Sequence, residues 1–137
     1  MRTAADNTAS DNDETQHKVS IAQIAEISKM IVARLDDDKA ENIIEIDLVD
    51  KSSIADTMII ASGRSARHVN ALTDHISRAL KEAGVTGVRT EGLQNCDWVL
   101  LDAGDIVVHI FRPEVREFYN IERIWGAETP SSDHLSA

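Results

Sequence analysis

The feature that most constrains the fold is a pair of apolar stretches joined by a very short connection. Residues 98–101 and 106–111 are dominated by aliphatic and aromatic side chains, and only the polar segment 102–105 separates them. So short a connection predicts an antiparallel hairpin, because parallel strands need a crossover of a dozen or more residues. If the turn is a simple two-residue loop, Trp98 lies opposite His109.

Side chains alternate across a strand, so this hairpin has two faces of different composition. One face is wholly aliphatic and predicts the side packed on the core: Val99, Leu101, Ile106, Val108 and Ile110. The other mixes aromatic, apolar and acidic groups: Trp98, Leu100, Asp102, Asp105, Val107, His109 and Phe111. An apolar centre with a charged rim is typical of a protein-binding surface. The alternatives are a helix or loop that covers this face, and a bulge at Gly104 that shifts the pairing.

The rest of the chain alternates between helical and strand patterns. Apolar residues recur at helical spacing in three segments: 24–35, 69–83 and 115–125. Three others have strand composition: 43–49, 57–61 and 87–90. The last helix begins at Pro113 and is expected to turn four apolar side chains inward: Val115, Phe118, Ile121 and Trp125. We therefore expect an α/β fold, a mixed sheet with helices packed mainly on one face, ending in the antiparallel hairpin and a C-terminal helix.

The two ends of the chain differ from the segment between them. Residues 1–18 form a polar, acidic tail without hydrophobic periodicity, and residues 127–137 are similar. We expect both tails to be disordered. Residues 19–126 should form one α/β domain, a length sufficient to bury its own core.

Net charge restricts the kind of partner. The chain carries 24 acidic and 14 basic side chains, a formal net charge of -10 at pH 7. Such a surface repels phosphate and anionic lipid, which disfavours direct membrane binding and leaves nucleic-acid contact at most peripheral. A basic protein partner is favoured, although the charge could serve solubility alone. With no targeting segment and no apolar run long enough for a bilayer, we expect a cytoplasmic protein.

Groups suited to catalysis are few. Glu45 and Asp47 lie on one side of a predicted strand, where paired carboxylates could hold Mg²⁺. Ser62 and Gly63 follow the next strand and could present backbone N–H groups to a phosphate. Together they weakly suggest a nucleotidyltransferase, but such enzymes place the acidic pair after the Gly-Ser turn, not before it. Two solvated carboxylates are the simpler interpretation.

Other potentially reactive residues give no stronger signal. His68 and His75 are seven residues apart on one helix, which favours a solvated helical face over a metal site. Cys96 is the only cysteine, so it cannot form an intramolecular disulfide. No P-loop, G-x-S-x-G or zinc motif occurs. We therefore expect no catalytic residue, no metal and no cofactor.

Short motifs stand in a specific order along most of the chain. They are KSSIAD (51–56), MIIASG (58–63), SARHV (65–69), EG (91–92), DWVLLD (97–102), GDIVVH (104–109) and REFY (116–119). In this order they resemble the ribosomal silencing factor family, also called the Iojap family, over about residues 20–126. The resemblance implies a fold related to nucleotidyltransferases without their catalytic carboxylate arrangement, and therefore no enzyme.

The resemblance also implies a function. Members of this family bind ribosomal protein L fourteen of the large ribosomal subunit and sterically block joining of the small subunit. They thereby lower translation when nutrients are scarce. Family members can self-associate, which leaves a homodimer open. A ribosome-assembly adaptor on the same partner is an alternative, and a nucleotidyltransferase-like enzyme is a less favoured one.

Transferred to this chain, the family's binding surface centres on Trp98 and Leu100. The residues expected to bind the partner are Glu91, Asp97, Trp98, Leu100, Asp102, Asp105, Val107, His109, Tyr119 and Glu122. Those that are acidic should face basic groups of the partner. The motif residues with an expected structural role are Asp56, Gly63, Arg67 and Gly92. For Asp56 we expect an internal ion pair that holds the loops.

Overall fold

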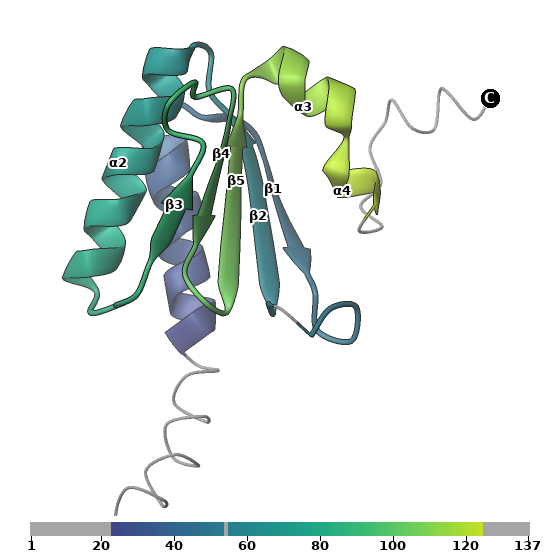
Figure 1. Cartoon of the computed structure of the whole chain (residues 1–137). Helices are drawn as coiled ribbons and strands as arrows, with labels where there is room; N and C mark the ends of the chain where they lie inside the picture. The colour runs from purple at the N-terminus through teal and green to yellow at the C-terminus, as the bar shows by residue number, and fades with distance from the viewer. Residues whose placement is uncertain (1–22, 54, 125–137) are drawn as a thin grey trace, which may run out of the picture.

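The structure is a computed structural model that describes residues 23–53 and 55–124, and it contains a five-stranded mixed sheet (Figure 1). The strands are β1 (Glu41–Asp47), β2 (Thr57–Ser62), β3 (Arg89–Glu91), β4 (Trp98–Asp102) and β5 (Ile106–Phe111). Their spatial order is β1-β2-β5-β4-β3, with β2 and β5 parallel and every other neighbouring pair antiparallel. This confirms the predicted α/β class. The two tails, Ser20 and Trp125 lie outside the described residues.

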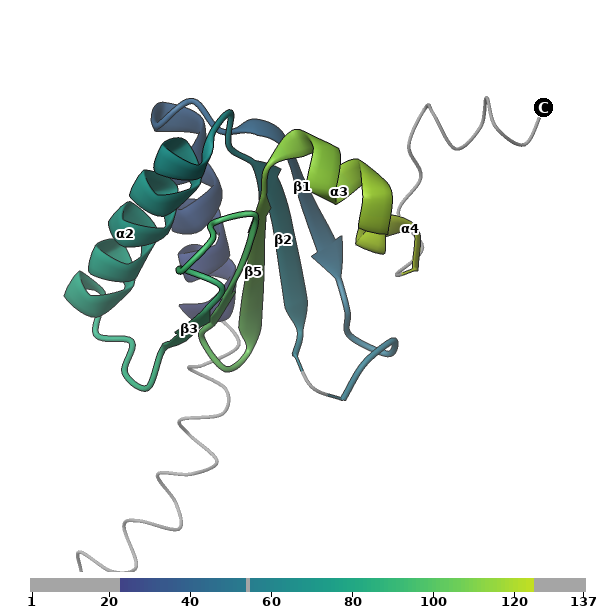
Figure 2. The same cartoon turned by 45° about the horizontal axis from the view of Figure 1, so that its top comes forward.

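Two long helices cover one face of the sheet (Figure 2). They are the N-terminal helix, described over residues 23–37, and α2 (Ala66–Glu82). Their apolar stripes meet the aliphatic face of the hairpin in one buried cluster, as the sequence pattern predicts. Ile31, Leu72 and Ile76 are fully buried there. Each such side chain contributes about 1.5–3 kcal/mol through burial, so this cluster forms the main core.

The ends of α2 are set by specific residues. The Ser65 hydroxyl accepts a hydrogen bond of 3.1 Å from the His68 backbone N–H, which caps the first turn. At the other end, Gly84 has a φ of +86°, a conformation that glycine adopts without steric cost.

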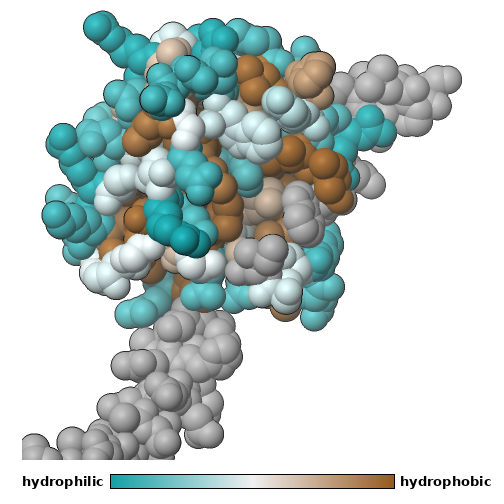
Figure 3. Space-filling model, in the orientation of Figure 1, coloured by the Kyte–Doolittle hydropathy of each residue, from teal (hydrophilic) through white to brown (hydrophobic). Residues whose placement is uncertain are grey.

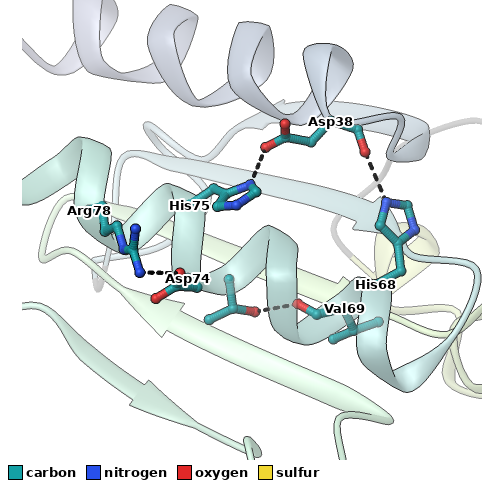
Figure 4. Close-up of polar contacts among 7 residues, drawn as sticks. Asp38, His68, Val69, Asp74, His75 and Arg78 are labelled. Carbon is teal, nitrogen blue, oxygen red and sulfur yellow. Dashed lines mark hydrogen bonds and ion pairs between the residues drawn. The ribbon is translucent and has the colours of Figure 1, made fainter.

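Two histidines of α2 connect it to the end of the N-terminal helix, contrary to the expectation of a solvated helical face. His75 Nδ1 lies 2.8 Å from an Asp38 carboxylate oxygen, and His68 Nε2 lies 2.9 Å from the Asp38 carbonyl oxygen (Figure 4). His68 Nδ1 accepts from the Arg64 backbone N–H, so Nε2 carries the proton and donates to Asp38. Asp38 thus joins the two helices.

The hairpin has a different register from the one expected for a two-residue loop. Trp98 lies opposite Phe111, not His109. The turn is centred one residue later than expected, on Gly104 and Asp105: the Ala103 N–H donates to the Ile106 carbonyl and Gly104 has a φ of +91°. The register differs by two residues, and side chains alternate with a period of two, so every side chain keeps its predicted face.

The opposite face of the sheet is partly covered by two short helices, α3 (Pro113–Tyr119) and α4 (Ile121–Ile124) (Figure 2). Ile121 is buried and Val115 packs against the same apolar cluster, as expected. Phe118 is 81% exposed, so its predicted inward orientation is wrong. Asn120 adopts a left-handed conformation with a φ of 49° and interrupts the helix, which changes the direction of the side chains after it.

Gly92 supports the start of β4 in a way that no other residue could. Its φ is +93°, and a Cβ there would overlap the carbonyl oxygen of Trp98. We expect Gly92→Ala to lower the free energy of unfolding by about 3 kcal/mol, from backbone strain and overpacking together. Gly87→Ala is the matched control, since its φ is +73° but no atom lies within 4 Å of the added Cβ. Urea unfolding that gives equal losses for both variants would contradict this role.

Candidate partner-binding surface

The outer face of the sheet, opposite the two long helices, is divided into a covered half and an open half. On β1, β2 and β5, side chains such as Ile46, Met58 and Phe111 are buried in the cluster beneath α3 and α4. On β4, by contrast, Trp98 and Leu100 are only partly buried. Helices therefore cover one half of this face, which was the alternative expected from the sequence. The other half is left open, as the predicted binding surface requires.

The open half carries a row of aromatic, apolar and acidic side chains. We call it the Trp98 surface and define it by Glu91, Trp98, Leu100, Asp102 and Tyr119. Strand pairing places Glu91 beside Leu100, and the alternation of β4 puts Leu100 on the same side as Trp98 and Asp102. Tyr119 reaches the surface from α3, with its ring centroid 4.8 Å from that of Trp98.

Trp98 is held by an aromatic cluster. Its ring stacks on Phe111 at a centroid distance of 4.9 Å, and its Nε1–H donates a 2.9 Å hydrogen bond to His109 Nδ1. Because Nδ1 accepts, the neutral His109 ring carries its proton on Nε2. Phe111 is fully buried and His109 is nearly so. The indole is therefore fixed in place, and little side-chain entropy would be lost when a partner binds it.

Burial lowers the pKa of His109 from 6.5 to about 4. Between pH 6.5 and 4, His109 is protonated in the unfolded chain but stays neutral in the folded one. Its contribution to the free energy of unfolding is therefore fully present above pH 6.5 and is lost as the pH falls towards 4. We expect His109 to account for a loss of about 2–3 kcal/mol between pH 7.5 and 4.5. His109→Gln retains a neutral acceptor for Trp98. Its free energy of unfolding, measured with urea, should not show this loss between about pH 7.5 and 4.5. The same pH dependence in the variant would refute it.

The acidic rim of the surface is partly neutralised. Asp102 lies 3.8 Å from exposed Arg89, and Asp97 lies 2.9 Å from Arg112. Glu91 is exposed and forms no ion pair with another described residue. Pairs this exposed contribute about 0–1 kcal/mol, so their carboxylates can exchange partners at little cost.

The remaining predicted surface residues lie in varied environments. Asp105 is exposed in the hairpin turn, while Val107 is half-buried against the covered cluster. Phe118 was not among the predicted surface residues. It is 81% exposed on α3, and its ring meets that of Tyr119 edge-on at a centroid distance of 5.0 Å. Apolar side chains gather over α3 and α4 in Figure 3, beside hydrophilic ones. These helices extend the apolar area next to the Trp98 surface.

Glu122 does not lie on the surface. Its side chain is 8% exposed, and both carboxylate oxygens accept hydrogen bonds of 3.2 Å from the Arg116 guanidinium. Arg116, equally buried, also donates to the Ser62 hydroxyl at 2.9 Å. The partner-binding role expected for Glu122 is thus replaced by an internal one: it fastens α3 and α4 to the end of β2.

The structure supports a structural role for some, but not all, of the four motif residues for which one was expected. Gly63 is needed for close packing, since a Cβ there would lie 2.8 Å from Val69 Cγ2, and Gly92 was described above. Asp56 makes no ion pair with a described residue, contrary to expectation, and holds the loops through its backbone instead. Its N–H donates to the Asp105 carbonyl and its carbonyl accepts from the Leu48 N–H, both at 2.8 Å. Arg67 is exposed, without an ion pair among the described residues.

The residues that suggested nucleotidyl transfer do not meet. Strand pairing places Asp47 beside Thr57 at the start of β2, whereas Ser62 ends β2, five residues away. That separation is roughly 16 Å along the strand. The Ser62 hydroxyl is bound by Arg116, and the Gly63 N–H donates to the Phe111 carbonyl. This arrangement does not support the enzyme alternative.

None of the described helices combines the length and apolar character needed to cross a membrane.

The structure is thus a small α/β domain with an open aromatic–acidic face, and similar proteins are known. A family model described as "Ribosomal silencing factor during starvation" matches residues 21–137. A "Ribosomal silencing factor RsfS" from Zymomonas mobilis is 52% identical over 108 residues, covering 79% of this chain and 81% of the relative. A mouse protein named "Mitochondrial assembly of ribosomal large subunit protein 1" is 31% identical over 99 residues, covering 70% of this chain and 43% of that protein.

Solved structures agree with these matches. A crystal structure of a protein from Chromobacterium violaceum superposes with a TM-score of 0.75 at 45% identity, covering 78% of this chain and 89% of that one. A second, from Bacillus halodurans, gives a TM-score of 0.67 at 33% identity, covering 77% and 99%. The chain belongs to the ribosomal silencing factor family.

Proposed function

We propose that this chain is a translational repressor acting in the cytoplasm, which binds the large ribosomal subunit through ribosomal protein L fourteen and sterically blocks joining of the small subunit. The observation that carries the proposal is the Trp98 surface, the half of the outer sheet face that α3 and α4 leave open. Membership of the ribosomal silencing factor family supports ribosome-associated regulation. The named partner and the steric mechanism are our inference.

The shape and chemistry of the Trp98 surface support a protein partner. A rigid aromatic centre of Trp98 and Tyr119 offers contact area that is already ordered, as in energetically dominant interface residues. Around it, Glu91 and Asp102 provide negative charge suited to Lys and Arg side chains. The net charge of -10 would add long-range attraction to a basic ribosomal protein.

A ribosome-assembly adaptor on the same partner is the second candidate. The name of the mouse relative, which refers to assembly of the large ribosomal subunit, favours it. The adaptor would use the same surface but act on precursor particles, whereas a silencer acts on mature subunits. Self-association stays a prediction for either function.

Charge reversal at Glu91 tests the binding surface with little risk to the fold. Glu91 is exposed, so Glu91→Lys should leave the domain intact while placing a cation against a basic partner. We expect binding to purified large subunits to weaken about tenfold, because like charges across an interface cost up to several kcal/mol. Co-sedimentation at a series of protein concentrations measures this loss.

Glu82→Lys is the matched control for that experiment. It makes the same charge change at an exposed position near the end of α2, on the other side of the sheet. Equal weakening by both variants would mean that only overall charge matters, and the Trp98 surface would then not be the binding site.

A further inference from the structure

A second concave site lies apart from the Trp98 surface, between the N-terminal helix and the edge strand β1. It is a cavity of about 390 Å³ lined by Ile24, Ala25, Ser28, Glu45, Asp47, Val49, Asp56 and Thr57. None of these residues belongs to the Trp98 surface. Within the part of the chain that the structure describes, β1 ends the sheet on this side, and no further strand closes the cavity.

Three carboxylates line the cavity, and none of the described residues that line it is basic. Glu45, Asp47 and Asp56 form no ion pair with any described residue. The Asp47 carboxylate is oriented by a hydrogen bond of 2.9 Å from the Val49 backbone N–H. Ile24, Ala25 and Val49 supply apolar wall, and Val49 is 53% exposed. The cavity thus combines uncompensated negative charge with aliphatic surface.

Ser28 gives an independent indication that a ligand binds here. It lines the cavity from the N-terminal helix, is 3% exposed, and its hydroxyl makes no hydrogen bond with another described residue. A buried polar group without a partner is unfavourable, and most such groups in native proteins have one. A hydrogen bond to a ligand in the cavity would remove that cost.

The arrangement of the carboxylates argues against a metal ion as the ligand. Oxygen ligands of Mg²⁺ or Ca²⁺ must converge to about 2.0–2.6 Å from one ion. Within the described part of the chain, no three acidic, histidine or cysteine side chains are arranged to do so. An elongated cation with an apolar body fits the site better.

We propose that this cavity binds an aliphatic ammonium group, with its charge between Glu45, Asp47 and Asp56 and its alkyl chain along Val49 and Ile24. Two sources share this chemistry: a free diamine and the lysine side chain of a protein. This site is independent of the proposed ribosome-binding surface, so either one can fail without the other.

The test is an NMR titration of the full ¹⁵N-labelled chain with separate probes at constant ionic strength. 1,4-Diaminobutane represents the free diamine, and Nα-acetyl-lysine methylamide represents the lysine side chain. Magnesium chloride tests charge alone. We expect saturable shifts of the backbone N–H signals of Ser28, Val49 and Thr57 with at least one ammonium probe. The probe that binds identifies the source.

Variants decide whether the cavity is responsible. Glu45→Gln with Asp47→Asn should weaken the responding probe about fivefold or more, since each exposed pair contributes up to about a fivefold effect. Glu82→Gln with Glu117→Gln removes the same charge elsewhere and should change binding little. Ser28→Ala should also weaken binding, while its melting temperature without a ligand should stay the same or rise.

Three results would overturn the proposal. They are the absence of saturable shifts with either ammonium probe, equal shifts with magnesium chloride, and unchanged binding in the Glu45→Gln, Asp47→Asn variant.

Discussion

Glu122→Ala is expected to lower the free energy of unfolding by about 3–5 kcal/mol, because it leaves the buried Arg116 guanidinium without its counter-charge. Both side chains are 8% exposed, and two hydrogen bonds of 3.2 Å join them. Losing this pair should release α3 and α4 from the sheet end at Ser62. Urea denaturation, with hydrogen exchange of the α3 amides, measures both effects.

The control for this prediction removes both charges together. Arg116→Met with Glu122→Leu leaves no unpaired ion in the interior, and such replacements are often neutral or stabilising. The double variant should therefore recover most of the stability that Glu122→Ala loses. A double variant as unstable as the single one, or a single variant within about 1 kcal/mol of the wild type, would contradict this account of the α3–α4 attachment.

Trp98→Ala should weaken binding to the large ribosomal subunit by more than tenfold. Truncating a central interface aromatic typically costs about 2 kcal/mol or more, and this residue also positions Tyr119. Co-sedimentation with purified subunits gives the affinity, and circular dichroism verifies that the variant is folded.

Trp98→Phe separates the contact made by the ring from its hydrogen bond. It keeps an aromatic ring against Phe111 but loses the donor to His109. We expect its affinity to lie between those of the wild type and Trp98→Ala. If folded Trp98→Ala binds subunits with wild-type affinity, the Trp98 surface is not the binding site.

The two faces of the hairpin could be predicted from sequence because alternation across a strand depends only on position. Val99 and Leu101 had to share one side, and Trp98 and Leu100 the other, whatever the register. The register itself could not be predicted, since it depends on turn geometry. Here Gly104 adopts a positive φ, and its N–H is bound by the Asp102 carboxylate at 2.8 Å.

The C-terminal helices show where periodicity fails. Val115, Phe118 and Ile121 would share one face of a continuous helix, which predicted that all three point inward. Asn120 breaks that helix in a left-handed conformation, so Ile121 after the break is buried, while Phe118 before it points to solvent. The same break brings Glu122 back onto Arg116 across six residues, a spacing that a straight helix does not bring together. No simple sequence signal marks this pair.

The sequence predicted the central residues of the candidate site but not how far the open surface around them extends. Trp98 and Leu100 lie where the pattern of the hairpin placed them, half-buried at the open edge of the outer face. How much of that face α3 and α4 cover depends on contacts between distant segments, such as Arg116 with Ser62. A pattern read from one strand at a time does not contain those contacts.

The most direct test of the central claim is a sucrose-gradient profile of purified small and large subunits, mixed under joining conditions with and without the full chain. The account predicts that the protein migrates with the large subunit and that free subunits increase at the expense of joined ribosomes. Glu91→Lys should do both less effectively. An unchanged fraction of joined ribosomes, with the wild-type protein bound to large subunits at saturation, would contradict steric blocking.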